Sequence, residues 1–208
     1  MNRQQGTVLG SAPKHRMAAQ GAERRNAVVR GAYHVLAEKG FEGLRMREIA
    51  KKAGMDHATL HYYFKGKKAL IHGVLDYIVQ ELSIGRSAST EDKGMEPSQR
   101  LAAHFDELVR QVREKPEMFL VLAEINARAM RDPKVRAVVA ENDERWKHFL
   151  TQIVKEGIQK GEFHSALGLA TAVDAIVAMV RGLSVTYVRR PAAMERPLRQ
   201  LRMWLEAK

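Results

Sequence analysis

The 208-residue chain contains no cysteine, which excludes disulfides and thiolate metal sites and suits a reducing compartment. It shows no apolar run that approaches the roughly 18 residues needed to cross a bilayer. Its first 21 residues hold no apolar stretch of the kind that a secretory signal requires. The sequence therefore predicts a cytoplasmic protein that has no membrane partner.

Two further absences narrow the fold and the function. Alternating β-branched segments, which are typical of strands, are missing, whereas apolar residues recur at helical spacing throughout. The chain also contains no glycine-rich phosphate loop, no nucleophile elbow and no metal triad. His164 and Ser165 adjoin in a predicted turn, but no catalytic partner accompanies them. The sequence thus predicts an all-α protein that is not an enzyme and binds no cofactor.

Positive charge is concentrated in the first third of the chain. The formal net charge is +11. Residues 1–68 contain 14 lysines and arginines against five acids, whereas the remaining 140 residues contain 21 against 19. This asymmetry favours an anionic partner for the first third, either nucleic acid or an acidic membrane surface. A basic face that only keeps the protein in solution is the simpler alternative.

The apolar pattern also predicts how the chain is organised. Residues 1–20 are mixed in character and should form a flexible basic arm. Residues 83–97 are small and polar, so they should form a linker. Before the linker, helices are predicted at about 22–39, 46–53, 57–63 and 67–82. After it, they are predicted at about 99–114, 116–130, 132–157, 169–188 and 192–206.

The second and third predicted helices form a helix-turn-helix, in which Gly54 breaks the first helix and Asp56 caps the second. When successive residues are placed 100° apart, the large apolar side chains face inward: Leu60, Tyr63 and Phe64. The outward side chains are small, hydroxylic or aromatic, and none is acidic: Ala58, Thr59, His61 and Tyr62. A small residue at Ala58 permits a close approach to base edges in DNA.

Basic residues at neighbouring helix starts fit phosphate contacts. Lys67 and Lys68 begin the fourth predicted helix, where the helix dipole assists anion binding. Arg45 and Arg47 lie at the start of the second helix. The predicted DNA-binding residues are therefore Arg45, Arg47, His57, Ala58, Thr59, His61, Tyr62 and Lys67.

The segment from Phe41 to Leu70, FEGLRMREIAKKAGMDHATLHYYFKGKKAL, resembles the TetR family of bacterial transcriptional regulators. The resemblance is close over about fifty residues. Beyond them it rests on helix layout and on weaker features such as AEINARAMRDP, GEFH and MVRGLS. The shared pattern runs without a gap through Gly40-Phe41, Ile49-Ala50, Ala53-Gly54, Thr59-Leu60, Tyr63-Phe64, Lys67 and Leu70.

The resemblance implies an all-α homodimer of about nine helices. Residues 21–66 would be the DNA-binding domain, and residues 67–208 would bind a small ligand and dimerise. The implied function is a sequence-specific repressor that binds a near-palindromic, double-stranded operator and is released by a small-molecule effector. Control by a protein partner, or activation of transcription, is the alternative.

Two positions depart from the family pattern. The family usually has threonine at the start of the second helix, where this chain has Arg45 and Met46, so a weaker helix cap is expected. The family also usually has tyrosine after the Thr-Leu pair, where this chain has His61. His57 and His61 have the spacing of two zinc ligands on one helical face, but no third ligand is evident. No metal site is therefore predicted.

The effector should occupy a cavity among helices five to eight. Glu124 and Asn126 are the clearest polar indications, because they lie on the most apolar helix and require partners. Glu124 could instead pair with Arg128. A largely apolar effector with one or two polar groups is expected, although most of the candidate side chains would simply fill a core. The candidates are His104, Phe105, Leu108, Phe119, Leu122, Asn126, Trp146, Phe149, Ile176 and Met179.

Dimerisation is predicted to use the helix at Leu169–Val188 together with the last helix. The former is apolar on more than one face, and a soluble domain has no reason to expose such a surface. The alternative is that both faces are covered within the chain. Close helix approach is permitted by small residues: Ala170, Ala172, Ala175, Ala178 and Gly182.

Overall fold

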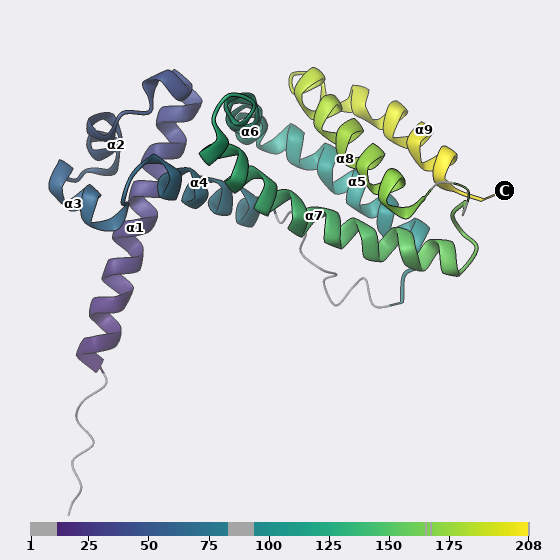
Figure 1. The fold of residues 1–208 in the computed structure, drawn as a ribbon, viewed down its shortest axis with the longest axis horizontal. Coiled ribbons are helices and arrows are strands. Elements are labelled where there is room, and N and C mark those ends of the chain that lie inside the picture. Colours follow the sequence, from purple (N-terminus) through teal and green to yellow (C-terminus); the bar gives the residue numbers. More distant parts are fainter. Residues whose placement is uncertain (1–11, 83–93, 165, 167, 208) are drawn as a thin grey trace, which may run out of the picture.

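The computed structural model describes residues 12–82, 94–164, 166 and 168–207 (Figure 1). These residues form nine α-helices and two short 3-10 helices, with one isolated β-bridge between Phe163 and Glu206. The first part comprises α1 (Ala12–Lys39), η1 (Phe41–Gly43), α2 (Met46–Ala53), α3 (His57–Tyr63) and α4 (Lys67–Glu81). The second comprises α5 (Pro97–Glu114), α6 (Pro116–Ala129), α7 (Pro133–Gln159), α8 (Leu169–Thr186), η3 (Pro191–Met194) and α9 (Glu195–Leu205). The all-α prediction is confirmed.

The helices form two parts, which we call the head (α1–α3) and the body (α5–α9). Figure 1 shows the head at one end of the elongated molecule, the body at the other, and α4 running between them. The head contacts the body through α1 and η1, which pack on α6, while α4 packs on α7. α3, in the head, therefore lies far from the opposite end of the body.

The start of α1 differs from the prediction. The helix begins at Ala12 rather than near Ala22, so residues 12–20 of the expected arm are helical in the structure. Alanine, lysine, arginine, methionine and glutamine dominate this stretch, and all are strong helix formers. Pro13 lies in the first turn, where proline is tolerated. Residues 1–11 of the arm and residues 83–93 of the predicted linker lie outside the described residues.

The head is built on a close approach between α1 and α2. A Cβ atom added at Gly31 would lie 3.1 Å from the backbone oxygen of Ile49 and 3.2 Å from the backbone nitrogen of Ala53. Gly54 then ends α2 in the left-handed conformation (φ 64°), which glycine adopts without steric cost. Leu60 of α3 is fully buried, and α3 packs on α2. Gly31 thus permits the close packing of α1 on α2, and Gly54 forms the turn of the helix-turn-helix.

The core of the body includes a hydrogen bond between two aromatic side chains. Trp146 on α7 donates from Nε1 to Nε2 of His104 on α5 (3.3 Å), and the Phe149 ring lies 5.3 Å from the His104 ring. Because an indole nitrogen only donates, His104 must be neutral, with its proton on Nδ1. Burial lowers the pKa of His104 to about 4, in agreement with this assignment.

The expectation that no segment is apolar enough to cross a membrane is wrong for α8. By length and composition it is apolar enough to cross one. Its two charged side chains, however, both pair with α7. Lys147 donates to Asp174 at 2.6 Å, and Arg181 pairs with Asp143. α8 therefore packs as a helix of the body, where it contacts α6, α7 and α9.

The free energy of unfolding should fall as the pH drops from 6.5 to about 4, because His104 is neutral in the fold and gains a proton on unfolding. The unfolded chain binds more protons in this window, so stability rises with pH across it. The full shift corresponds to about 3 kcal/mol, and the solvent contact of the partly buried ring reduces this value.

Urea titrations at pH 7.0 and 4.5 on wild type and His104→Gln check this prediction. The glutamine amide oxygen still accepts from Trp146 but does not titrate, so the variant should lose part of the pH dependence. The same change in unfolding free energy in both proteins would contradict the assignment of a neutral, buried imidazole.

Candidate nucleic-acid interface

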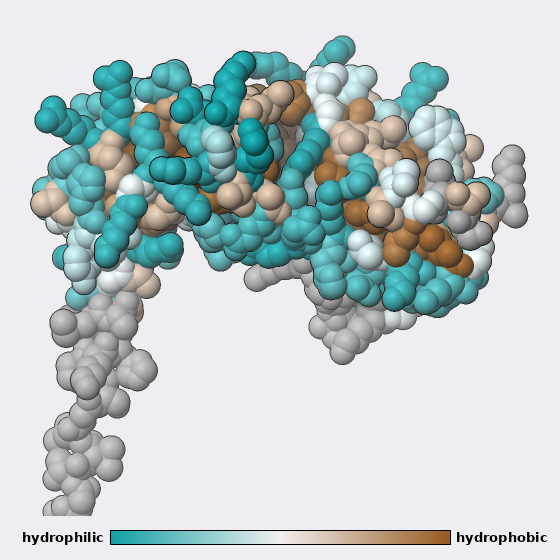
Figure 2. Space-filling model, viewed as in Figure 1, coloured by the Kyte–Doolittle hydropathy of each residue, from teal (hydrophilic) through white to brown (hydrophobic). Residues whose placement is uncertain are grey.

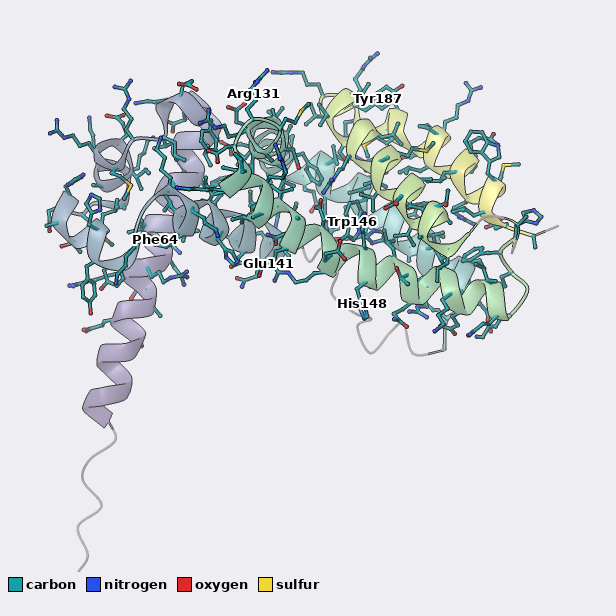
Figure 3. All side chains as sticks on the ribbon, in the orientation of Figure 1. Phe64, Arg131, Glu141, Trp146, His148 and Tyr187 are labelled. Atoms are coloured by element: carbon teal, nitrogen blue, oxygen red, sulfur yellow. The ribbon has the colours of Figure 1, made fainter. Side chains whose placement is uncertain are left out.

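α3 presents the face that the sequence predicts. Leu60 is fully buried, and Phe64 directly after the helix is 1% exposed; in Figure 3 Phe64 lies beside α1. On the opposite side the Tyr62 side chain is 81% exposed. Three further outward side chains are also exposed: His57, Ala58 and His61. The exposed surface of α3 is thus aromatic, small and free of acids.

Asp56 fixes the start of α3, as predicted. Its carboxylate accepts from the backbone N–H of Thr59 (2.7 Å) and from the Thr59 hydroxyl (2.6 Å). Both hydrogen bonds lower the pKa of Asp56, and the bond from the hydroxyl has the larger effect. The negative charge of Asp56 is therefore directed into its own helix. The hydroxyl proton of Thr59 is used in the cap, so the predicted DNA contact of this residue would involve its methyl group or oxygen lone pairs.

Exposed cations surround α3 on two sides. Arg45 and Arg47 lie at the start of α2, where Arg45 gives no side-chain cap, as expected from the missing threonine. Three exposed lysines lie around the start of α4: Lys65, Lys67 and Lys68. Within the part of the chain that the structure describes, none of the five cations forms an ion pair. They are free to meet an external anion.

The two histidines of α3 adjoin each other in an edge-to-face contact. The ring centroids of His57 and His61 are 4.5 Å apart. Among the described residues, no three histidine or acidic side chains lie close enough to hold a metal ion together. The pair belongs to the exposed face of α3 and adds two hydrogen-bonding rings to it.

The junction between head and body centres on Phe41. Its backbone N–H donates to Oε1 of Glu124 on α6 (2.8 Å), and the Arg128 guanidinium lies 4.9 Å from the centre of its ring. The Lys67 ammonium lies 6.0 Å from the same ring. The Tyr33 hydroxyl of α1 also donates to Glu117 of α6 (3.1 Å).

This junction corrects the reading of Glu124. The residue does need a partner, but the partner is the backbone of the head rather than an effector or Arg128. Arg128 instead lies 4.0 Å from Glu42 and 3.6 Å from Asp132. The one signal in the sequence for this contact is an acid in the middle of an apolar helix, and this signal does not identify the residue that the acid binds.

The ten candidate effector residues separate into distinct environments. His104, Trp146 and Phe149 come together between α5 and α7. Asn126 donates from its side chain to the backbone oxygen of Leu122 on its own helix (2.8 Å), so its amide already has a partner. Leu122 and Met179 are partly buried, and the remaining four are buried: Phe105, Leu108, Phe119 and Ile176.

A cavity of about 360 Å³ lies between α5 and α9. Of the ten candidates, only Phe105 lines it. Its other apolar side chains include Val109 and Leu198, and its polar ones are Asp106, Arg110, Arg113, Glu195, Arg199 and Arg202. Several of these cations form ion pairs with acids. Arg110, for example, pairs with Glu107 and Glu114.

Comparison with known proteins identifies the family to which the chain belongs. Residues 28–74 match the bacterial regulatory proteins of the tetR family. Residues 97–207, more than half of the chain, match the C-terminal domain of BetI-type transcriptional repressors. The transcriptional repressor KstR2 of Mycolicibacterium smegmatis is 25% identical over 171 residues, which cover 82% of this chain and 80% of KstR2.

Solved structures share the same fold. A TetR-family protein from Rhodococcus sp. superposes with a TM-score of 0.79 at 24% identity, covering 88% of this chain and 98% of that one. FadR from Bacillus subtilis, in complex with stearoyl-CoA, superposes with a TM-score of 0.73 at 21% identity, covering 86% and 98%. The chain belongs to the TetR family of bacterial transcriptional regulators, which are DNA-binding proteins and not enzymes.

Proposed function

We propose that this regulator is a repressor that binds a near-palindromic operator as a homodimer and is released by a small, largely apolar effector. DNA binding is supported by one observation: the exposed face of α3 contains no acid and lies between two groups of cations that form no ion pair with the described residues. A helix of this width enters the major groove, and the cations on either side meet the phosphates that border it.

The exposed side chains divide into two roles. The Tyr62 side chain is 81% exposed, and the small Ala58 on the same face leaves room for a close approach, so these two positions would read bases. Arg45, Arg47 and Lys67 lie outside the α3 face, where contacts to phosphate fix orientation and register. His61 belongs to the exposed face of α3, and its ring would donate a hydrogen bond to either a base edge or a phosphate.

Dimerisation is supported by an uncovered stripe along α8. Small or apolar side chains on one side of the helix are exposed: Ala175, Ala178, Gly182 and Val185. On α9, Met203 and Trp204 are 60% and 58% exposed. Figure 2 shows tan and brown side chains gathered over this end of the molecule. A second copy would bury this surface through close helix packing.

The effector part of the proposal depends on α6. This helix carries Phe119 into the core of the body, and on its other side Glu117 and Glu124 hold the head. An effector that displaced α6 from inside the body would therefore move the head. FadR, which shares this fold, is solved in complex with stearoyl-CoA, and the long acyl chain of that ligand supports an effector with a large apolar part. A protein partner acting on α6, or activation instead of repression, is the second candidate.

Tyr62→Ala should weaken binding to a selected operator more than binding to a mixed-sequence duplex, narrowing the ratio of the two affinities by about tenfold or more. Lys67→Ala should weaken both alike and lower the slope of log K against log salt by about one. Fluorescence anisotropy at several salt concentrations measures both effects. Lys155→Ala, an exposed change on α7, is the control. Identical behaviour of the Tyr62 and Lys67 variants would show that the assignment of roles is wrong.

Gly182→Arg should convert the dimer into a monomer. The position of its Cβ has open space around it within one chain, so the substitution is compatible with the fold of the protomer. In a dimer, the same side chain would separate two closely packed copies of α8. Sedimentation velocity at micromolar concentration gives the mass, and circular dichroism checks the fold. Ala140→Arg, an exposed site on α7, is the matched control. A monomeric wild type, or a Gly182 variant that still forms the dimer, would contradict the proposed interface.

A further inference from the structure

α1 extends well beyond the part of the head that it stabilises. The helix has 28 residues, and Val28 is the first of its described side chains to be buried. Sixteen residues, 12–27, therefore precede the packed part, a length of about 24 Å at 1.5 Å per residue. Figure 1 shows this half of α1 projecting away from the head, past α3 and into open space.

Such a helix has little to hold it in isolation. The described side chains from Ala19 to Asn26 are all exposed except the partly exposed Gly21. Gly21 lies in the middle of this stretch, and a Cβ added there would meet nothing within 4 Å. An unsupported helix of this length is only marginally stable in water, and an internal glycine lowers its stability further. A surface that packs against the extension would supply the missing stabilisation.

The charge of the extension restricts what that surface can be. The first 22 residues of the chain contain no aspartate or glutamate. Lys14 and Arg16 lie in the first turns of α1, and Arg24 and Arg25 follow near its packed part. Glu23 is the one acid of the extension. A helix of this composition complements a polyanion.

The base of the extension also lies next to the end of α3. Arg25 lies with its guanidinium 4.9 Å from the centre of the Phe64 ring, directly after the end of α3. The exposed Arg24 is its neighbour. Two exposed arginines of α1, Arg24 and Arg25, therefore add to the cations around α3. DNA that contacts α3 would pass next to the base of the extension.

We propose that residues 12–27 of α1 bind the DNA backbone beside the segment that α3 reads, and that they do so as a helix. The extension enlarges the footprint of each protomer by phosphate contacts that carry no sequence information. DNA would also stabilise the helix of the extension, because the phosphates neutralise its charge. This inference rests on DNA binding by the head and adds a second contact surface to it.

Gly21 gives a test that changes helix propensity alone. Gly21→Ala should strengthen binding to a labelled 40-base-pair mixed-sequence duplex, up to about fivefold per bound chain. Gly21→Pro should break the extension and weaken binding. Circular dichroism should show a gain of helix when the wild type binds the duplex, and this gain should be absent in the proline variant. A flexible, purely electrostatic arm would respond to neither substitution.

Charge provides the second test. The double variant Lys14→Ala and Arg16→Ala keeps good helix formers but removes two cations, so the slope of log K against log salt should fall by about two per bound chain. Gly21→Pro should bind the duplex about as weakly as this variant. The matched control, Lys134→Ala with Lys155→Ala, removes the same charge from exposed sites on α7 and should leave the slope unchanged.

The outcomes separate this proposal from the DNA-binding function itself. If the wild type binds the duplex and the Gly21 and charge variants bind it equally well, the proposal is overturned while DNA binding stands. A wild type that binds no duplex overturns both. Sedimentation with phosphatidylglycerol vesicles that requires Lys14 and Arg16, together with unchanged duplex binding by the same variant, would assign the extension to a membrane surface instead.

Discussion

Phe41 is where the two halves of the molecule meet. Its backbone N–H is held by the Glu124 carboxylate at 2.8 Å, and its ring lies below the Arg128 guanidinium. A Cβ added at Gly40 would lie 3.3 Å from the same carboxylate, so the approach of η1 to α6 depends on a glycine as well. Because α6 also carries Phe119 into the core of the body, it connects any event in that core with the position of α3.

The surfaces left uncovered by this arrangement fit the proposed partners. The face of α3 is polar, aromatic and bordered by cations, which suits a DNA groove. The stripe on α8 with Trp204 on α9 is small or apolar, which suits a second protomer. The N-terminal half of α1 is basic and unsupported, which suits a backbone of phosphates. Of the three, the stripe on α8 and α9 is the one whose exposure to water costs free energy, because it is apolar. The two basic surfaces are well hydrated and would gain from a polyanion through electrostatic attraction and the release of its counterions.

Sequence reasoning succeeds here where a local rule decides the outcome. The bounds of α2 and α3 follow from Gly54 and Asp56, and the inward and outward faces of α3 follow from helical periodicity. It fails where the answer depends on distant residues. The partner of Glu124 lies 83 positions away. His104 is neutral because the fold buries it, and the tryptophan that donates to it lies 42 positions away. Gly6, Gly10 and Pro13 indicate an irregular arm, but the strong helix formers that follow Ala12 let α1 begin there.

The proposed function requires two copies of the α3 face to read a symmetric DNA site. Selection of duplexes bound by the wild-type protein from a random pool is the most direct test. We expect enrichment of two inverted half-sites whose centres lie about one helical turn, or a multiple of it, apart. Recovery of a single asymmetric site, or no enrichment at salt concentrations that preserve binding, would contradict it.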